Sequence, residues 1–192
     1  MARIFITGSA DGLGYLSAKL LIKKGHKVVL HARNKERAND TLNKLPEAEK
    51  VLTGDLSNIE ETIKLADQVN NSGSFDAVIH NAGVYRTSAK EILHVNTLAP
   101  YILTCLIQKP KRLIYLTSGM HLLGSSKLDS FKGNINDITY SDSKLHDLML
   151  SKAVARKWPD VYSNAVNPGW VPTKMGGPGA PDNLQKGYET QV

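Results

Sequence analysis

The chain has 192 residues and a mass of 21.0 kDa, a length typical of one domain with a continuous core. Hydrophobic residues make up 41% and charged residues 22%, and no apolar run approaches the ~20 residues of a membrane-spanning helix. The formal net charge of +6 comes from scattered lysines and arginines, which argues against a nucleic-acid-binding surface.

The N-terminus enters a strand pattern at once, without the features of a secretory leader. Cys105 is the only cysteine, so an internal disulfide is impossible. We therefore expect a cytoplasmic protein, with Cys105 as a small core side chain. The scattered spacing of His80, His94, His121 and His146 predicts no metal site, and we expect these side chains at the surface or in loops.

Apolar periodicity divides the chain into alternating strands and helices. Pro100 predicts a kink in a long helix, and the aperiodic stretch 119–139 predicts a lid or substrate loop. A second loop, rich in glycine and proline, is expected over 167–192. We expect strands at 2–7, 26–31, 50–53, 75–80, 113–117 and 161–166, and helices at 13–24, 35–45, 59–69, 89–108 and 140–157.

This alternation predicts an α/β fold, a Rossmann-type doubly wound parallel sheet with helices on both faces, in a single domain 1–192. Ligands of such folds bind beyond the carboxyl ends of the strands. Gly8, Asp55, Asn81, Ser118 and Asn167 each follow a predicted strand. Their shared position favours one site over five unrelated turns.

A glycine-rich turn joins the first strand to the first helix. Gly8, Gly12 and Gly14 would allow a tight turn, close approach of a ligand to the backbone, and close packing of helix on strand. The N-terminus of the following helix would present free N–H groups to a pyrophosphate. A phosphate cradle is the prediction, and a glycine-rich turn without a ligand is the alternative.

Tyr140 and Lys144 are four residues apart at the start of a predicted helix, so both side chains project from one face. An ammonium group beside a phenol stabilises the phenolate and makes the phenolic proton easier to transfer. The pair therefore predicts acid-base chemistry, with a solvated surface pair as the alternative.

The residues after the second strand bear on the choice of cofactor. An acidic side chain there would accept a bond from the ribose 2′-hydroxyl of NAD, whereas an arginine would bind the 2′-phosphate of NADP. Arg33 and Asn34 occupy this place, and the first carboxylate is Glu36. Arg33 can hold a phosphate bidentately, so NADP is preferred over NAD. The alternative is that Arg33 is only a solvated residue at a helix start.

Seven short motifs occur together in a fixed order. They are Thr7-Gly8-x3-Gly12-x-Gly14, Asp55-Leu56, Asn81-Ala82-Gly83, Asn96, Ser118, Tyr140-x3-Lys144, and Asn167-Pro168-Gly169 with Thr173. On these motifs the chain resembles the short-chain dehydrogenases/reductases along nearly its whole length. The long gap between Ser118 and Tyr140, with Ser-Lys-Leu following the tyrosine, is similar to the retinol-dehydrogenase-like branch.

The resemblance implies four catalytic residues. Tyr140 would be the general acid in carbonyl reduction and the base in alcohol oxidation, aided by Lys144. Ser118 would donate a hydrogen bond to the substrate oxygen, and Asn96 would hold a water in a proton relay. The implied cofactor-binding residues are Thr7, Gly8, Asp11, Gly12, Leu13, Gly14, Arg33, Asn34, Asp55, Leu56, Asn81, Ala82, Gly83, Tyr140, Lys144, Pro168, Gly169, Val171 and Thr173.

Three of these residues have structural alternatives. Asn96 could cap or bend a helix, and Ser118 could be only a turn residue at a strand end. Asp55 could contact the adenine or could equally be a turn or helix-cap side chain.

The resemblance implies an oxidoreductase that transfers a hydride between NADP(H) and a small carbonyl or alcohol substrate. The alternative is a catalytically silent dinucleotide-binding sensor or scaffold. Family members usually continue with a further helix and a seventh strand, which we expect this chain to lack. Helices 89–108 and 141–158 would form the contact of a homodimer or homotetramer. Leu122, Leu123, Trp170 and Met175 suggest apolar walls for the substrate.

Overall fold

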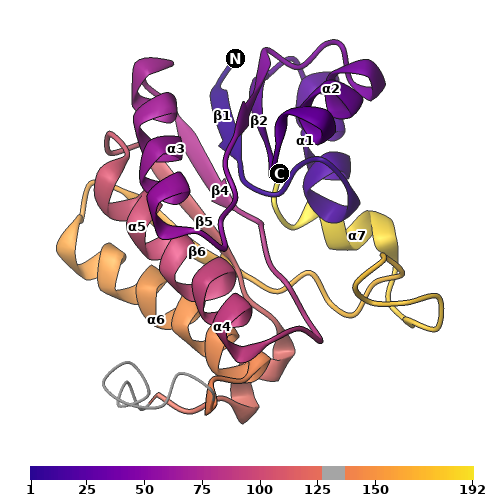
Figure 1. Cartoon of the computed structure of the whole chain (residues 1–192), viewed down its shortest axis with the longest axis vertical. Coiled ribbons are helices and arrows are strands. Elements are labelled where there is room, and N and C mark those ends of the chain that lie inside the picture. The colour runs from indigo at the N-terminus through magenta and orange to yellow at the C-terminus, as the bar shows by residue number, and fades with distance from the viewer. Residues whose placement is uncertain (127–136) are drawn as a thin grey trace.

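The computed structural model describes residues 1–126 and 137–192, so part of the predicted 119–139 loop lies outside the described residues. The described residues contain one sheet, between two groups of helices (Figure 1). All its strands are parallel, in the order β3-β2-β1-β4-β5-β6, which confirms the predicted doubly wound sheet. The strands are β1 (Arg3–Ile6), β2 (Lys27–Ala32), β3 (Lys50–Thr53), β4 (Ala77–His80), β5 (Arg112–Leu116) and β6 (Tyr162–Val166).

Helices cover both faces of the sheet. Figure 1 shows α3, α5 and α6 on one side, with α1, α2 and α7 on the other. The α-helices are α1 (Gly12–Lys23), α2 (Lys35–Lys44), α3 (Ile59–Asn71), α4 (Ala89–Ile92), α5 (Ala99–Leu106), α6 (Tyr140–Lys157) and α7 (Leu184–Glu189). A π-helical stretch, η1, spans Leu93–Leu98, and a 3₁₀ helix, η2, spans Gly119–Leu123.

The central strands are buried on both faces. Phe5 and Val29 pack on the side of α3 and α5, while Ile4 and Val28 pack on the side of α1. Successive side chains of a strand point to opposite faces of the sheet. A strand with an apolar layer on each face therefore needs apolar residues at successive positions. This is why the strands read as continuous apolar runs in the sequence.

The long helix predicted over 89–108 is divided by the π-helical stretch η1, which ends two residues before Pro100. Proline has no N–H to donate, and its ring clashes with the carbonyl four residues earlier in a regular α-helix. Pro100 lies in the first turn of α5, where the missing donor is tolerated. The helical stretch before this proline is thus irregular, with a wider π-helical turn that contains Asn96.

The segment predicted as a C-terminal loop over 167–192 contains a helix, α7. Asn183 caps it by accepting a hydrogen bond from Lys186 N, and Ser17 Oγ of α1 donates to Tyr188 O at 3.0 Å. Six residues are too few to show helical periodicity clearly. The helix is stabilised by packing against α1, which a local pattern does not reveal.

Two expectations about buried and exposed side chains were wrong. Cys105 is exposed, because it shares a face of α5 with exposed Tyr101 while Leu103 points into the core. His80 and His146 are buried. Helices supply each imidazole with a polar partner, Thr104 for His80 and Thr97 for His146, both at 3.2 Å, and these bonds offset part of the cost of burial. 

Candidate active site

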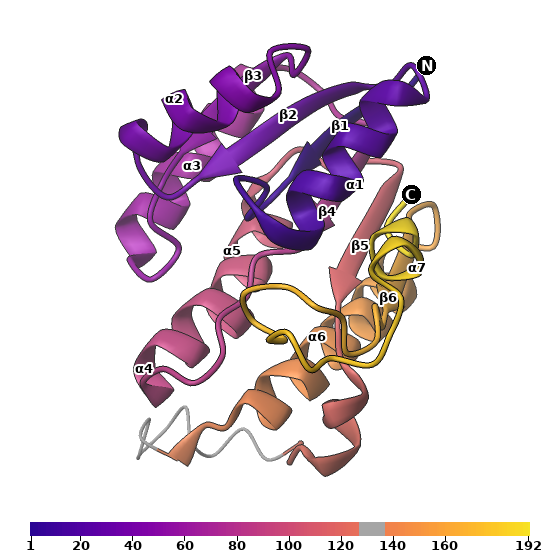
Figure 2. The ribbon, with the colours of Figure 1, turned by 90° about the vertical axis from the view of Figure 1, so that its right-hand side faces the viewer.

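A cavity of about 1020 Å³ lies at the carboxyl ends of the strands. The segment after β6, yellow in Figure 2, folds back over this edge of the sheet. Thr7, Gly14, Asn34, Asn96 and Asn167 do not line the cavity, whereas the other predicted site residues do. Those that line it are Gly8, Asp11, Gly12, Leu13, Arg33, Asp55, Leu56, Asn81, Ala82, Gly83, Ser118, Tyr140, Lys144, Pro168, Gly169, Val171 and Thr173.

The turn after β1 requires glycine at two places. Gly8 has a φ of +61°, and a Cβ there would lie 2.8 Å from Ala82 Cα. A Cβ on Gly14 would lie 2.4 Å from Asn81 Nδ2 and 2.7 Å from Gly8 O. The turn, α1 and the end of β4 are therefore packed too closely for any side chain at these positions.

Thr7, behind the cavity, and Asn81, which lines it, hold this turn in place. The Thr7 hydroxyl accepts hydrogen bonds from the backbone N–H groups of Asn81 and Ala82, each at 3.1 Å. The Asn81 side-chain amide donates to Thr7 O at 2.9 Å and to Gly8 O at 3.0 Å. These residues act by joining the ends of β1 and β4 across the sheet.

His31, at the end of β2, is a site residue that the sequence patterns did not single out. Its Nδ1 accepts from Gly8 N at 3.0 Å, and its Nε2 donates to Gly54 O at 2.8 Å. Burial lowers the pKa of His31 to about 4, so the ring is neutral near pH 7. The neutral imidazole joins the turns that follow β1 and β3. A histidine inside an otherwise apolar strand was the only local signal.

Two of the arginines that line the cavity come after β2 in the chain. Arg33 is exposed to the cavity, and Arg37 on α2 forms an ion pair with Asp11 at 2.7 Å. Burial works against ionisation of Asp11, but the hydrogen bond and charge of Arg37 outweigh it, so the pKa of Asp11 is below its usual value. Asn34 caps α2 by accepting from Arg37 N, which accounts for its position outside the cavity.

Asp55 has the bonding of a turn residue, one of the two roles that the sequence allowed. Its Oδ1 accepts from Ser57 N at 2.9 Å and from Ser57 Oγ at 2.7 Å, which is the bonding of a turn residue before α3. The same residue and Leu56 line the cavity beside Arg33.

Tyr140 begins α6, and a capping box places it there. The Thr139 hydroxyl accepts from Asp142 N, while the Asp142 carboxylate accepts from Thr139 N at 2.8 Å. The ring of Tyr140 lies 4.8 Å from that of Tyr85, centroid to centroid. The ammonium nitrogen of Lys144 is 5.7 Å from the Tyr140 ring centroid. The phenol and the ammonium group therefore share one wall of the cavity.

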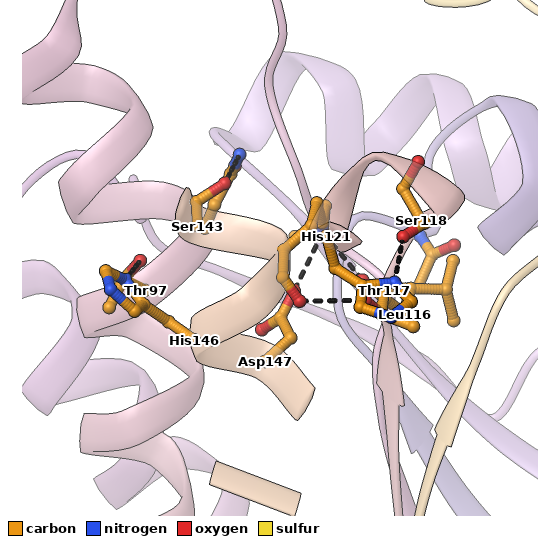
Figure 3. Close-up of polar contacts among 12 residues, drawn as sticks. Thr97, Leu116, Thr117, Ser118, His121, Ser143, His146 and Asp147 are labelled. Atoms are coloured by element: carbon orange, nitrogen blue, oxygen red, sulfur yellow. Dashed lines mark hydrogen bonds and ion pairs between the residues drawn. The ribbon is translucent and has the colours of Figure 1, made fainter. Parts of the chain in front are cut away.

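Lys144 is almost fully buried below that wall. Its Nζ donates to Leu116 O at 2.6 Å and to Asp147 Oδ2 at 2.8 Å, and the Thr117 hydroxyl donates to Lys144 O at 2.7 Å. Burial opposes the charge, but the Asp147 carboxylate and Tyr140 outweigh it, so the pKa of Lys144 is raised. Figure 3 shows Asp147 on α6 beside Leu116 and Thr117 at the end of β5.

Ser118 and Asn96 are placed differently. Ser118 lines the cavity and caps η2, because its hydroxyl accepts from Met120 N at 3.3 Å. The Asn96 side chain accepts from Val84 N at 2.8 Å and donates to Val84 O and to Ser143 Oγ. Asn96 thus secures the loop after β4 from within the π-helical stretch.

The expected apolar walls are only partly present. Trp170 and Met175 line the cavity, together with Met120 and Tyr85. Leu122 and Leu123, on η2, are 80% and 79% exposed and do not line it.

In residues 1–126 and 137–192, no group of three or more histidine, cysteine, aspartate or glutamate residues could hold a metal ion. The helices of the same described part include none long and apolar enough to cross a membrane.

Comparison with known proteins identifies relatives along nearly the whole chain. The family model described as short chain dehydrogenase matches residues 2–183. An uncharacterized oxidoreductase of Emericella nidulans is 48% identical over 198 residues, covering 97% of this chain and 76% of that protein. The short-chain dehydrogenase chyC of Penicillium rubens is 43% identical over 206 residues, covering 100% of this chain and 80% of that protein.

Solved structures share the fold at low sequence identity. The short-chain dehydrogenase from Sphingobium yanoikuyae in complex with NADPH has a TM-score of 0.80 at 20% identity, covering 98% of this chain and 82% of that one. Salutaridine reductase from Papaver somniferum also has a TM-score of 0.80 at 20% identity, covering 100% of this chain and 94% of that one.

Proposed function

The chain belongs to the short-chain dehydrogenase family, and we propose that it is an oxidoreductase that transfers a hydride between NADP(H) and a small carbonyl or alcohol substrate, with Tyr140 as the acid or base. One observation carries this proposal. A single cavity is lined both by the glycine turn after β1 and by Ser118, Tyr140 and Lys144.

The residues present fit a dinucleotide. Gly12 begins α1, and nothing lies within 4 Å of the place where its Cβ would be, so the helix N-terminus is open to a pyrophosphate. The volume of about 1020 Å³ is at the upper end of the range for ligand sites. A volume of this size supports a large ligand such as a dinucleotide.

The cations beyond β2 favour NADP over NAD in this proposal. Arg33 and Arg37 both line the cavity where a 2′-phosphate would lie, and charge-assisted bonds from a guanidinium group to phosphate are strong. Asp11 holds Arg37 in place. The NADPH in the Sphingobium yanoikuyae structure is consistent with this preference.

Bound NADPH would supply the hydride to the carbonyl carbon. Tyr140 would give its phenolic proton to the carbonyl oxygen as the alcohol forms, and would take it back in the reverse reaction. The Lys144 cation would stabilise the phenolate left on Tyr140, and the Ser118 hydroxyl would hold the substrate oxygen. Each of these three side chains lines the same cavity.

The test is a fluorescence titration with NADPH and with NADH, followed by a turnover assay over a panel of aldehydes and ketones. We expect tighter binding of NADPH than of NADH, and NADPH oxidation with at least one carbonyl compound. Binding of NADPH without turnover of any carbonyl would favour the silent sensor or scaffold. Binding of neither dinucleotide would refute the assignment of the cavity.

A further inference from the structure

A buried carboxylate lies directly behind the lysine of the site. The side chains of Lys144 and Asp147 are each 5% exposed, and Nζ is 2.8 Å from Asp147 Oδ2. The two residues lie three positions apart on α6, so they share one face of the helix. This arrangement differs from the exposed pair Lys109–Asp160, which solvent screens.

The hydrogen bonds of Lys144 hold its ammonium group in one position. The ammonium group has three N–H donors, and Leu116 O and Asp147 Oδ2 accept two of them. These acceptors anchor Nζ at the floor of the cavity, from opposite elements, β5 and α6. The third donor is left for a group within the cavity, which Lys144 lines.

The other groups that face Asp147 carry no positive charge. Tyr115 faces it from β5, and burial raises the pKa of this phenol, so it is neutral. His80 of β4 stacks on Tyr115 at 4.9 Å, and burial lowers the pKa of His80 to about 3, so it is neutral too. Thr104 of α5 bonds the Tyr115 hydroxyl, and Cys105 follows it in the chain. Lys144, with Tyr140 above it, is therefore the cation that Asp147 meets among the described residues.

A buried ammonium group loses its hydration and tends to release its proton. A carboxylate within hydrogen-bonding distance opposes this tendency, because a buried ammonium group that is paired with a carboxylate has a lower free energy than one that is buried alone. Burial raises the pKa of Asp147 to about 6, partly offset by Lys144, so the carboxylate is mainly ionised at pH 7 and above. The pair thus exists in its charged form where the enzyme is expected to work.

We propose that Asp147 is a positioning residue, the counter-ion that keeps Lys144 protonated and holds its ammonium group beneath Tyr140. This role rests on the proposed function, since a charged Lys144 is needed to stabilise the Tyr140 phenolate. Without the carboxylate, the buried Lys144 would lose its proton as the pH rises, and the acid-base pair would fail on the alkaline side.

The test compares the wild type with Asp147→Asn, which keeps the shape but removes the charge. Asp67→Asn on α3 is the control, because it removes one carboxylate from an exposed position far from the site. Nuclear magnetic resonance of protein labelled with ¹³C at lysine Cε follows the protonation of Lys144, whose signal is assigned by its loss in Lys144→Arg. Turnover is measured from pH 6 to pH 10 in the same variants.

We expect the pKa of Lys144 to fall in Asp147→Asn and to stay unchanged in Asp67→Asn. We also expect kcat of Asp147→Asn to be roughly tenfold lower than that of the wild type at pH 9, but within about twofold at pH 6.5. A merely structural role would lower kcat equally at all pH values. An unchanged pKa of Lys144 in folded Asp147→Asn overturns the proposal.

If the wild type binds NADPH but reduces no carbonyl compound, the proposed function fails, and the resonance titration of Lys144 still decides the role of Asp147. If Asp147→Asn does not fold, the ¹³C carboxyl signal of Asp147 in the wild type is measured instead. An ionised carboxylate at pH 7.5 supports the ion pair, and a protonated carboxyl at that pH overturns it.

Discussion

At the scale of single residues, the proposed chemistry depends on a phenol and an ammonium group from successive turns of α6. Tyr140 is oriented by the capping box of Thr139 and by contact with the ring of Tyr85. Lys144 is oriented by Leu116 O and Asp147. Each functional side chain is thus held by groups that take no part in proton transfer.

Tyr140→Phe removes only the transferable proton and keeps the ring against Tyr85. We expect kcat to fall by about 10²- to 10⁴-fold, with the Kd of NADPH changed by less than about threefold. Steady-state kinetics and a fluorescence titration measure the two quantities. Tyr101→Phe, at an exposed position of α5, is the control. Substantial turnover by Tyr140→Phe would remove the catalytic role from Tyr140.

Arg33→Ala removes one of the two guanidinium groups beyond β2. We expect the Kd of NADPH to rise by about 10- to 100-fold, since a hydrogen bond to a charged group contributes about 1.5–3 kcal/mol, while the Kd of NADH changes little. Lys35→Ala is the control, because it removes the same charge from an exposed residue that does not line the cavity. Equal losses of affinity for both dinucleotides would exclude a contact with the 2′-phosphate.

At the scale of elements, the turn between β1 and α1 combines conformation and close packing. Gly8 has a positive φ and touches Ala82, while the neutral ring of His31 bonds its N–H. Thr7 and Asn81 tie the same turn to the end of β4. The cradle is therefore a property of three strand ends together rather than of a glycine motif alone.

Gly8→Ala will destabilise the protein and abolish dinucleotide binding, because the new Cβ meets the Ala82 backbone in a conformation that alanine avoids. We expect a loss of at least about 2 kcal/mol in the free energy of unfolding, measured by urea denaturation. Gly25→Ala is the matched control: its φ is +85°, but nothing lies within 4 Å of the added Cβ. It should lose only about 1 kcal/mol and bind NADPH normally. Equal behaviour of the two variants would contradict the packing role of Gly8.

At the scale of the whole molecule, the two apolar layers of the sheet include polar side chains at the ends of the strands. His31, next to the last residue of β2, lines the cavity, and His80 ends β4 under α5. Burial lowers the pKa of His31 to about 4 and of His80 to about 3, from an ordinary value near 6.5. Folding therefore keeps both imidazoles neutral at pH values where an unfolded chain would protonate them.

This burial makes stability depend on pH. As the pH falls from about 6.5 toward 4, His31 and His80 become protonated in the unfolded chain but not in the folded chain. The free energy of unfolding therefore falls. Asp147 acts in the opposite direction, because its pKa is raised by folding. His80→Phe keeps the stacking on Tyr115 and removes one imidazole whose pKa is lowered by folding. The free energy of unfolding of this variant should therefore depend less on pH. Urea denaturation at pH 7 and pH 5 measures the change in the free energy of unfolding between these two pH values. An equal change in the wild type and in His80→Phe would contradict the prediction.

The order and type of most elements could be predicted from local patterns. Strands buried on both faces require successive apolar residues, as in Val28 and Val29, and helices show one apolar face. The short helix α7 and the π-helical stretch at Asn96 were missed, because each depends on contacts with other elements. The branch within the family and the preference for NADP stay predictions.

Local patterns were enough to predict the parallel α/β fold and most of the residues that meet at the carboxyl ends of its strands, because periodicity and turn chemistry are properties of neighbouring residues. Three interactions emerge only in the folded protein: His31 bonds Gly8 across 23 positions, Arg37 pairs with Asp11, and Lys144 and Asp147 form a buried ion pair. The strength of these interactions depends on burial and on the distance between atoms. Both are fixed by how helices and strands pack, which a local window of sequence does not contain.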